Sequence, residues 1–468
     1  MMLKAWLSLF VMWAIGAAAL TLLCTDLRRW NLAAKLGLSF GFGLIVLNLS
    51  LFLTSLLGLK PAPWIGVLEL IVLGSSVLFA RRDRISHWSA RGEGPKTAWS
   101  PWVSALELLL TCFLVGIFVV VAAATLLEPV VEWDVLGIWA LKAKVLLHEP
   151  VITANYFRDF SKAYSHLDYP LLWPLAIAWI WSCSGEADLV VVKVLAVGLL
   201  GSTFLLFVGL LRRKHTRPAA LLFTALVAGI PMLLAQASRL MCDPPLAVFV
   251  LGAFVCAYFW LESNHGDDLR IAGVFAIGML FTKNEGLGFW FILILVVAVA
   301  ILLQRRIKRW LPAATWLVMV PLLATCAWFL FRSGIAKAHE NYGDKIHPVF
   351  FFNNVARVPE VLSGWLRAFL DWRDWLILWP LTLSILLISP RNIARPPVLF
   401  LALAATLPVV MYSYIYVVSP WDLKELMEAT ANRLLLHVTP LWVFFLAEQL
   451  RTTKLLVLTP VQTLEDTS

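Results

Sequence analysis

The stretch RIAGVFAIGMLFTKNEGLGFWFILILVVAVAILL at residues 270–303 decides the fold class. It is apolar almost throughout, yet it is too long for one membrane-spanning helix, which needs about 20 residues. Its strongest polar interruption is Thr282-Lys283-Asn284-Glu285-Gly286. Backbone breaks at membrane depth are tolerated only where protein or a cavity surrounds them. We therefore interpret this stretch as two helices that meet at this polar point inside a membrane-embedded bundle.

The composition of the whole chain supports this interpretation. Hydrophobic residues make up 61% of the 468 residues and charged residues 14%, whereas soluble chains carry roughly 25% charged residues. These values exclude a soluble globular protein, a disordered chain and a secreted disulfide scaffold. The net charge of +9 does not indicate a nucleic-acid partner, because the basic residues form short clusters between apolar runs. Cytoplasmic loops of multi-spanning proteins have this pattern.

Eleven further apolar runs are candidates for membrane crossings. With the divided stretch, they predict an all-α polytopic membrane helix bundle of about 13 transmembrane helices, with external juxtamembrane helices in the first long loop. The runs lie near residues 5–23, 37–58, 63–80, 102–126, 188–211, 217–236, 244–261, 311–332, 374–389, 397–417 and 434–449.

The basic clusters predict the sidedness of the chain. They alternate onto one side, taken as cytoplasmic, if the N-terminus lies outside and the stretch 170–184 stays outside as an amphipathic surface or re-entrant helix. The external side then holds the long loops 127–187 and 333–373. The cytoplasmic loop 81–101, with Arg91-Gly92-Glu93-Gly94-Pro95-Lys96, divides the chain into N-terminal helices (1–100) and a main module (101–468). The clusters are Arg28/Arg29, Arg81/Arg82/Arg84, Arg212/Arg213/Lys214, Arg305/Arg306/Lys308/Arg309, Arg391/Arg395 and Arg451/Lys454.

The first external loop carries the carboxylates best suited to chemistry. Glu132 and Asp134 flank Trp133, and on an extended backbone they would face the same side. Such a pair can supply a general base or hard metal ligands, although ordinary solvated loop acids are the alternative. Further along, His166 and Asp168 are candidate substrate contacts at the mouth of a cavity. Asp168 could instead simply cap the helix that Pro170 starts.

Ionisable residues at the external helix ends form a second group. Arg239 at a membrane boundary must snorkel or find an anion, and Arg433 enters a helix from outside. Asp243 before Pro244 could be only a helix cap. Lys283 in the broken helix is a functional candidate, with an internal salt bridge to Glu285 as the alternative. A set of cations and carboxylates on one face suits a lipid-phosphate substrate, with cations on the phosphate and a carboxylate activating a hydroxyl.

These motifs resemble those of the GT-C superfamily of polyprenyl-phosphate-sugar glycosyltransferases, in particular protein O-mannosyltransferases and lipid A aminoarabinose and galacturonosyl transferases. The resemblance covers roughly residues 100–450, and the order of the motifs is more specific than any one of them. Asp168-Tyr169-Pro170 departs from the family's Lys-Pro-Pro, and three extra helices precede the shared module. The matching segments are Glu132-Trp133-Asp134, Pro170-Leu171-Leu172-Trp173-Pro174, Ser238-Arg239 with Asp243-x-x-Leu246, Phe281-Thr282-Lys283-Asn284-Glu285-Gly286-Leu287 and Arg433-Leu434-Leu435-Leu436.

The resemblance implies transfer of a sugar from a polyprenyl-phosphate donor to a hydroxyl of a glycolipid, glycan or protein acceptor, with inversion. It implies a bacterial cytoplasmic membrane, with the site facing the periplasm or exterior. A divalent cation, Mg²⁺ or Mn²⁺, shared by Asp134 and Asp243 is an option. The implied roles are a catalytic carboxylate (Asp134, with Glu132), donor-phosphate cations (Arg239, Lys283, Arg433) and substrate-positioning residues (Asp243, Asp168, His166, Glu285).

A secondary transporter or lipid flippase is the main alternative, because broken helices with ionisable residues are typical of transporters. Against it, the sequence shows no internal repeat, and its acids gather in an external loop rather than at mid-depth. A structural protein without chemistry leaves Arg239, Lys283 and the carboxylates unexplained. For a transferase we expect Asp134 within a few Å of Asp243 and Lys283.

Overall fold

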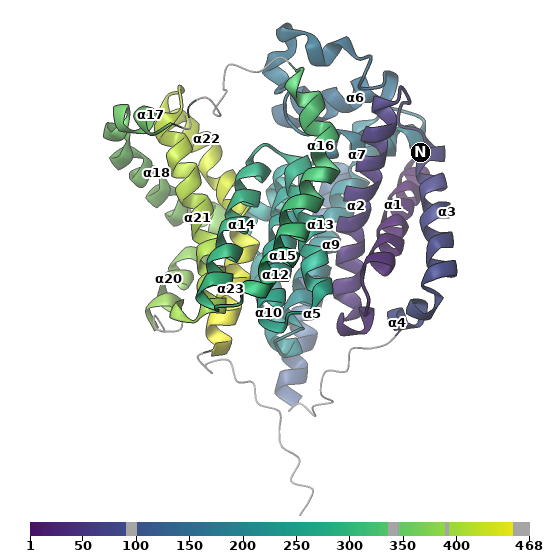
Figure 1. Cartoon of the computed structure of the whole chain (residues 1–468). Coiled ribbons are helices and arrows are strands. Elements are labelled where there is room, and N and C mark those ends of the chain that lie inside the picture. The colour runs from purple at the N-terminus through teal and green to yellow at the C-terminus, as the bar shows by residue number, and fades with distance from the viewer. Residues whose placement is uncertain (90–100, 336–344, 346, 389–392, 453–468) are drawn as a thin grey trace, which may run out of the picture.

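The computed structural model describes residues 1–89, 101–335, 345, 347–388 and 393–452 (Figure 1). The predicted boundary at 91–96 lies outside the described residues, as do Arg391 and Lys454. All regular elements in the described ranges are helices.

The main helices have the following bounds. They are α1 (Met2–Leu23), α2 (Leu32–Leu56), α3 (Pro63–Ala80), α4 (Ser86–Ser89), α5 (Pro101–Leu127), α6 (Ala140–His148), α7 (Leu172–Ser184), α8 (Leu189–Val192), α9 (Val194–Leu211), α10 (Arg217–Ala228), α11 (Pro231–Ser238), α12 (Asp243–Ser263), α13 (Gly266–Thr282), α14 (Glu285–Leu303), α15 (Trp310–Ala313), α16 (Val320–Ser333), α17 (Pro348–Asn353), α18 (Val358–Leu370), α19 (Trp372–Trp375), α20 (Leu378–Ile388), α21 (Pro396–Val418), α22 (Leu423–Leu436) and α23 (Thr439–Thr452).

The described residues contain nine helices long and apolar enough to cross a membrane, or ten if the bent pair α10–α11 is one span. The chain is therefore a multi-pass helical membrane protein. The predicted count of thirteen is not confirmed. The remaining predicted crossings correspond to shorter helices, namely α13 with 17 residues, α20 with 11 and α23 with 14.

The long apolar stretch divides at the predicted point. Helix α13 ends at Thr282, Lys283 is extended (φ −144°, ψ 160°), and α14 begins at Glu285. The break turns the chain, so that α13 and α14 can each pack separately on the bundle.

Helix α12 is the centre of the bundle. The 18-residue apolar window that marks it as a membrane span is entirely buried, whereas the corresponding windows of α3 and α5 are 17% and 11% buried. Between Asp243 and Glu262 the helix carries no charged residue, so it can be surrounded by other helices on every side. Its first residue, Asp243, therefore lies at the head of the core.

The bundle has two chemically different ends. One, here called the site end, carries Asp243 and the first residues of α12. In Figure 1 it is the upper end, where α6, α17 and α18 lie, while α4 and α20 lie toward the lower end. Contacts place residues of five basic clusters at the lower end, here called the basic end. These contacts are Arg28 with Asp26, Arg84 with the Cys24 carbonyl, Arg213 with Asp268, Arg309 with the Leu261 carbonyl and Arg451 with Glu448.

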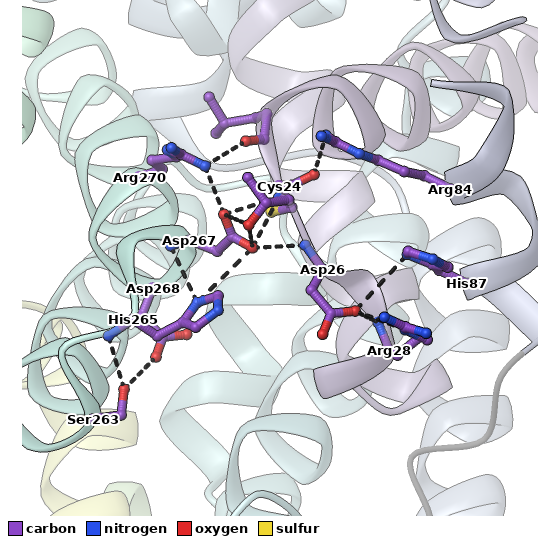
Figure 2. A network of polar contacts seen from close by, with 12 residues as sticks. Cys24, Asp26, Arg28, Arg84, His87, Ser263, His265, Asp267, Asp268 and Arg270 are labelled. Atoms are coloured by element: carbon purple, nitrogen blue, oxygen red, sulfur yellow. Dashed lines mark hydrogen bonds and ion pairs between the residues drawn. The ribbon is translucent and has the colours of Figure 1, made fainter. Parts of the chain in front are cut away.

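A polar network ties the N-terminal helices to the core at the basic end (Figure 2). The buried Asp267 carboxylate accepts hydrogen bonds from the backbone N–H groups of Thr25 and Asp26, both at 2.9 Å, and from Arg270 at 2.8 Å. Asp267 lies in the first turn of α13, whereas Thr25 and Asp26 link α1 to α2. A buried carboxylate requires such partners, so this link is fixed against the α12–α13 hairpin.

A second contact at the same end uses Asp268 and Arg213. The guanidinium binds both carboxylate oxygens, at 2.7 and 3.1 Å. It lies over the rings of Trp30 and Phe259, 4.3 and 4.1 Å from their centroids. Cation–π and bidentate contacts both favour this geometry, so α2, α9 and the α12–α13 hairpin share one anchor.

Helix α7 differs from the amphipathic surface helix expected over 170–184. It is buried along almost all of its length, including Trp173, Trp179 and Ile180. The Trp173 indole donates to the Leu240 carbonyl at 3.0 Å, and Gly185 ends the helix with a left-handed φ of 89°. The expectation of an amphipathic surface helix is therefore wrong, because α7 packs inside the bundle, while the re-entrant alternative stays a prediction.

Helices α1 and α2 approach each other closely at glycines. A Cβ at Gly16 would lie 1.8 Å from the Ser39 carbonyl oxygen, and one at Gly43 would lie 1.9 Å from the Met12 carbonyl oxygen. Small residues allow such backbone contact between membrane helices.

Gly16→Ala should therefore destabilise the protein by about 1–3 kcal/mol, the usual range for overpacking. The measurement is thermal unfolding of the purified protein in detergent. Gly74→Ala is the matched control, since a Cβ at Gly74 meets nothing within 4 Å and alanine favours the helix. Equal melting temperatures for the two variants would contradict the close α1–α2 contact.

Candidate functional site

The carboxylate of Asp243 is the hub of the site end. Its side chain is 1% exposed. Oδ1 accepts hydrogen bonds from Lys283 Nζ and His437 Nε2, both at 2.8 Å, and Oδ2 accepts one from Arg433 Nη2 at 3.0 Å. The N-cap of α12 is Cys242, so the interpretation of Asp243 as a simple cap is wrong. A buried anion with three donors holds several elements in one place.

The backbone explains how these partners meet. Helices α12 and α13 form an antiparallel hairpin, so the end of α13 returns Lys283 to the start of α12. Arg433 lies in the last turn of α22, and His437 follows it by four residues, which places both on one helical face. His437 is fully buried, and its Nδ1 lies 2.8 Å from the Tyr412 hydroxyl.

Asp134 joins the hub through Arg433. Its Oδ2 lies 2.6 Å from Arg433 Nη2, the same nitrogen that contacts Asp243. Asp134 precedes a π-helical turn (Val135–Trp139) in the first external loop. The Arg433 guanidinium thus joins Asp134 to Asp243, from distant parts of the chain. Lys283, the fourth predicted residue, joins them through Asp243.

Glu132 does not share this partner. Its Oε1 lies 3.3 Å from Nε of Arg239, whose side chain is 51% exposed. The expected extended backbone is absent, because the Val135 N–H donates to the Glu132 carbonyl and helical turns begin at Trp133. The two carboxylates therefore contact different arginines.

Lys283 is buried, and two carboxylates surround it. Its ammonium lies 2.8 Å from Asp243 and 3.1 Å from Glu285, and its side chain is 6% exposed. The bridge to Glu285 is thus present together with the contact to Asp243. Three buried polar atoms around this cluster lack a protein partner: Glu285 Oε2, Asn284 Oδ1 and Arg433 Nε. Such atoms mark places where a ligand or water can bind.

Asp168 belongs to a neighbouring cluster. It accepts hydrogen bonds from Arg332 Nη2 at 2.9 Å and from Asn284 Nδ2 at 3.0 Å. The N-cap of α7 is Leu171, so Asp168 does not cap that helix. His166 is left-handed (φ 51°), and its ring stacks on Tyr169 with centroids 4.7 Å apart.

Four residues of the site end had no predicted role: Arg332, Asn284, His437 and Tyr412. Asn284 lies inside the quoted motif, and Arg332 ends an apolar run. His437 could have been found from its spacing of four after Arg433. Tyr412 offers no such signal, because a tyrosine within an apolar run is ordinary.

The carboxylate oxygens of Asp134 and Asp243 do not fit the divalent cation that the resemblance allows at this site. Both Asp243 oxygens already accept hydrogen bonds, and the Arg433 guanidinium lies where the two carboxylates converge. Within the described ranges, no group of three or more His, Cys, Asp or Glu side chains is arranged to hold a metal. Arg433 supplies the positive charge between the two carboxylates.

Comparison with family models, curated proteins and solved structures found no match to this chain. Its function is therefore inferred from the residues of the site and from the resemblance of its short motifs.

Asp243→Asn should destabilise the protein by about 3–5 kcal/mol, because Lys283 and Arg433 would lose the anion they share at the head of the core. Thermal unfolding in detergent measures the change. Asp83→Asn, which alters an exposed acid at the basic end, should leave the melting temperature unchanged. A melting temperature for Asp243→Asn equal to that of this control would show that the hub is not structural.

Lys142 in α6 should give the protein a distinct pH dependence. Burial lowers the pKa of Lys142 to about 7, and its Nζ donates a hydrogen bond to the His166 carbonyl. Since the unfolded value is higher, the unfolded chain binds more protons above pH 7, and stability rises with pH. The expected gain is about 1.4 kcal/mol per pH unit.

The test for Lys142 compares unfolding of the wild type and Lys142→Met between pH 7 and 9. The difference between them isolates the lysine, because other titrating groups act on both proteins. The wild type should gain stability relative to the variant as the pH rises. Parallel curves would contradict the burial of a neutral amine.

Proposed function

We propose that this chain is an integral-membrane glycosyltransferase that moves a sugar from a polyprenyl-phosphate donor to an acceptor hydroxyl, with inversion. The observation that supports it best is the single Arg433 guanidinium between Asp134 and Asp243, 2.6 and 3.0 Å away. This arrangement places a partly exposed carboxylate beside a fixed cation. Inverting transfer from a phosphate ester needs both a base and a cation.

The proposed step is a single displacement. The acceptor oxygen attacks the anomeric carbon and gives its proton to Asp134, while the bond from that carbon to the phosphate oxygen breaks. Negative charge grows on the departing phosphate. Arg433 and Arg239 would stabilise this charge, since preorganised cations act most strongly where charge develops.

Burial divides the roles of the charged residues. Asp134 and Arg433 are 26% and 24% exposed, so a substrate can reach them. Asp243, in contrast, is buried and can act only by holding Arg433 and Lys283. We therefore propose Asp134 as the base, with Glu132 holding Arg239, and Asp243 as a positioning residue.

The arrangement of the basic clusters supports an external site. They gather at the end of the bundle opposite Asp243, and cytoplasmic loops collect Lys and Arg. The site end would then face the periplasm or exterior of a bacterial cytoplasmic membrane. This topology includes α13, α20 and α23 as short crossings, which gives the thirteen of the sequence-based prediction.

The position of the broken helix favours a transferase over a transporter. Transporter sites lie near the bilayer midplane, between repeats. Here the break at Lys283 lies beside the first residue of α12, at the end of the bundle. Substrate that arrives from the outer leaflet would meet the charged residues there.

Asp134→Asn should abolish transfer, with a loss of at least 100-fold, since a positioned base contributes about 10²–10⁴-fold. The measurement is mass spectrometry of envelope glycolipids, glycans and glycoproteins from host cells. These cells would carry the wild type, a deletion or Asp134→Asn. One glycoform should be short by a single sugar in both the deletion and the variant.

Glu149→Gln, which changes an exposed acid in the same loop, is the matched control and should preserve the glycoform. Protein levels are measured in each strain. If the deletion changes the glycoforms but Asp134→Asn does not, Asp134 is not the base. Unchanged glycoforms in the deletion would count against a transferase altogether.

A further inference from the structure

A second arginine cluster lies beside the hub. Arg332, at the end of α16, contacts Asp168 at 2.9 Å, and the Asn284 amide contacts the same carboxylate oxygen at 3.0 Å. These residues come from three separate segments: the end of α16, the loop before α7 and the α13–α14 break. These contacts hold the Arg332 guanidinium in a defined position at the site end.

The open side of this arginine distinguishes it from Lys283. The Lys283 side chain is 6% exposed, and its ammonium is held by two carboxylates. The Arg332 side chain is 29% exposed, and Nη2 makes its one side-chain ion pair within the described ranges. A guanidinium has five N–H donors in a planar fork, and among the described residues only Asp168 is a side-chain partner of this one.

The Asp243 hub and the Arg332 cluster are linked through two adjacent residues, Lys283 and Asn284. Lys283 contacts Asp243, and the next residue, Asn284, contacts Asp168. Each arginine is thus linked through one carboxylate to this turn: Arg332 through Asp168 to Asn284, and Arg433 through Asp243 to Lys283. The Asn284 Oδ1 atom in this turn is buried and unpartnered. A ligand held by Arg332 would therefore be coupled to the hub through the turn at Lys283 and Asn284.

We propose that Arg332 binds a phosphate group of the substrate, oriented by Asp168 and Asn284, while Lys283 only positions Asp243 and Glu285. Arginine suits this role because its fork matches phosphate oxygens in pairs. The identity of the ligand as a lipid substrate rests on the proposed function. The phosphate chemistry rests on the open guanidinium itself.

The test is native mass spectrometry of the purified full chain in detergent. The protein is titrated separately with a long-chain polyprenyl monophosphate, with phosphatidylglycerol and with inorganic phosphate. Arg332→Gln should weaken polyprenyl phosphate binding at least tenfold, as expected for a lost charge-assisted hydrogen bond. The affinity of Arg332→Lys for polyprenyl phosphate should fall between those of the wild type and Arg332→Gln. Arg158→Gln is the matched control, because Arg158 is an exposed arginine of the external loop that carries Asp168.

Melting temperatures separate binding from folding. Arg332→Gln should melt close to the wild type, whereas Lys283→Gln should lose stability, because Lys283 is buried between carboxylates. Binding by Arg332→Gln within twofold of the wild type would overturn the proposal.

The three ligands distinguish the source of the phosphate. A loss confined to polyprenyl phosphate identifies the donor lipid. An equal loss for phosphatidylglycerol or inorganic phosphate supports a general phosphate site. If the wild type binds phosphatidylglycerol through Arg332 but not polyprenyl phosphate, the proposed donor is wrong while the phosphate site stands.

Discussion

The burial of one carboxylate at the head of the central helix constrains the site end. An unpaired charge in such a place is strongly unfavourable, so Asp243 must be surrounded by donors. Lys283, Arg433 and His437 supply them from the α13–α14 break and from the end of α22. The break in the long apolar stretch contributes to the hub, because the extended backbone of Lys283 at the end of α13 sets the direction from which its side chain reaches Asp243.

The opposite end of the α12–α13 hairpin is also held by buried carboxylates paired with arginines. Asp267 and Asp268 at the start of α13 are buried, with Arg270 and Arg213 as their cations. The α12–α13 hairpin is therefore fixed by ionic contacts at both ends, and its interior is apolar. Fixed ends hold Asp243, and through it Arg433, in one geometry, which the preorganisation of the proposed reaction requires.

Much of the architecture could be predicted because an apolar chain has few places for polar residues. The helix break at Lys283 and the convergence of Asp134, Asp243 and Lys283 at one end follow from that constraint, whereas the Arg433 link between the two carboxylates was not predicted. The pairing of Glu132 with Arg239 could not be predicted, since it depends on a helical turn that begins at Trp133. The burial of α7 was also missed, because its aromatic residues suit either an interface or a core. The sequence likewise gave Arg332 no signal beyond the end of a span.

Under the proposed function, exposure rather than residue type separates the charged groups that would touch substrate from those that would support them. Buried ions are already neutralised by partners and can contribute only geometry, as Lys283 does between Asp243 and Glu285. Partly exposed arginines can present donors to a ligand while a carboxylate holds them in place. Arg332 and Arg433 are of this second kind. In this proposal a phosphate would meet cations whose positions are set by Asp168 and Asp243, and the more exposed Asp134 would be left to act on the acceptor.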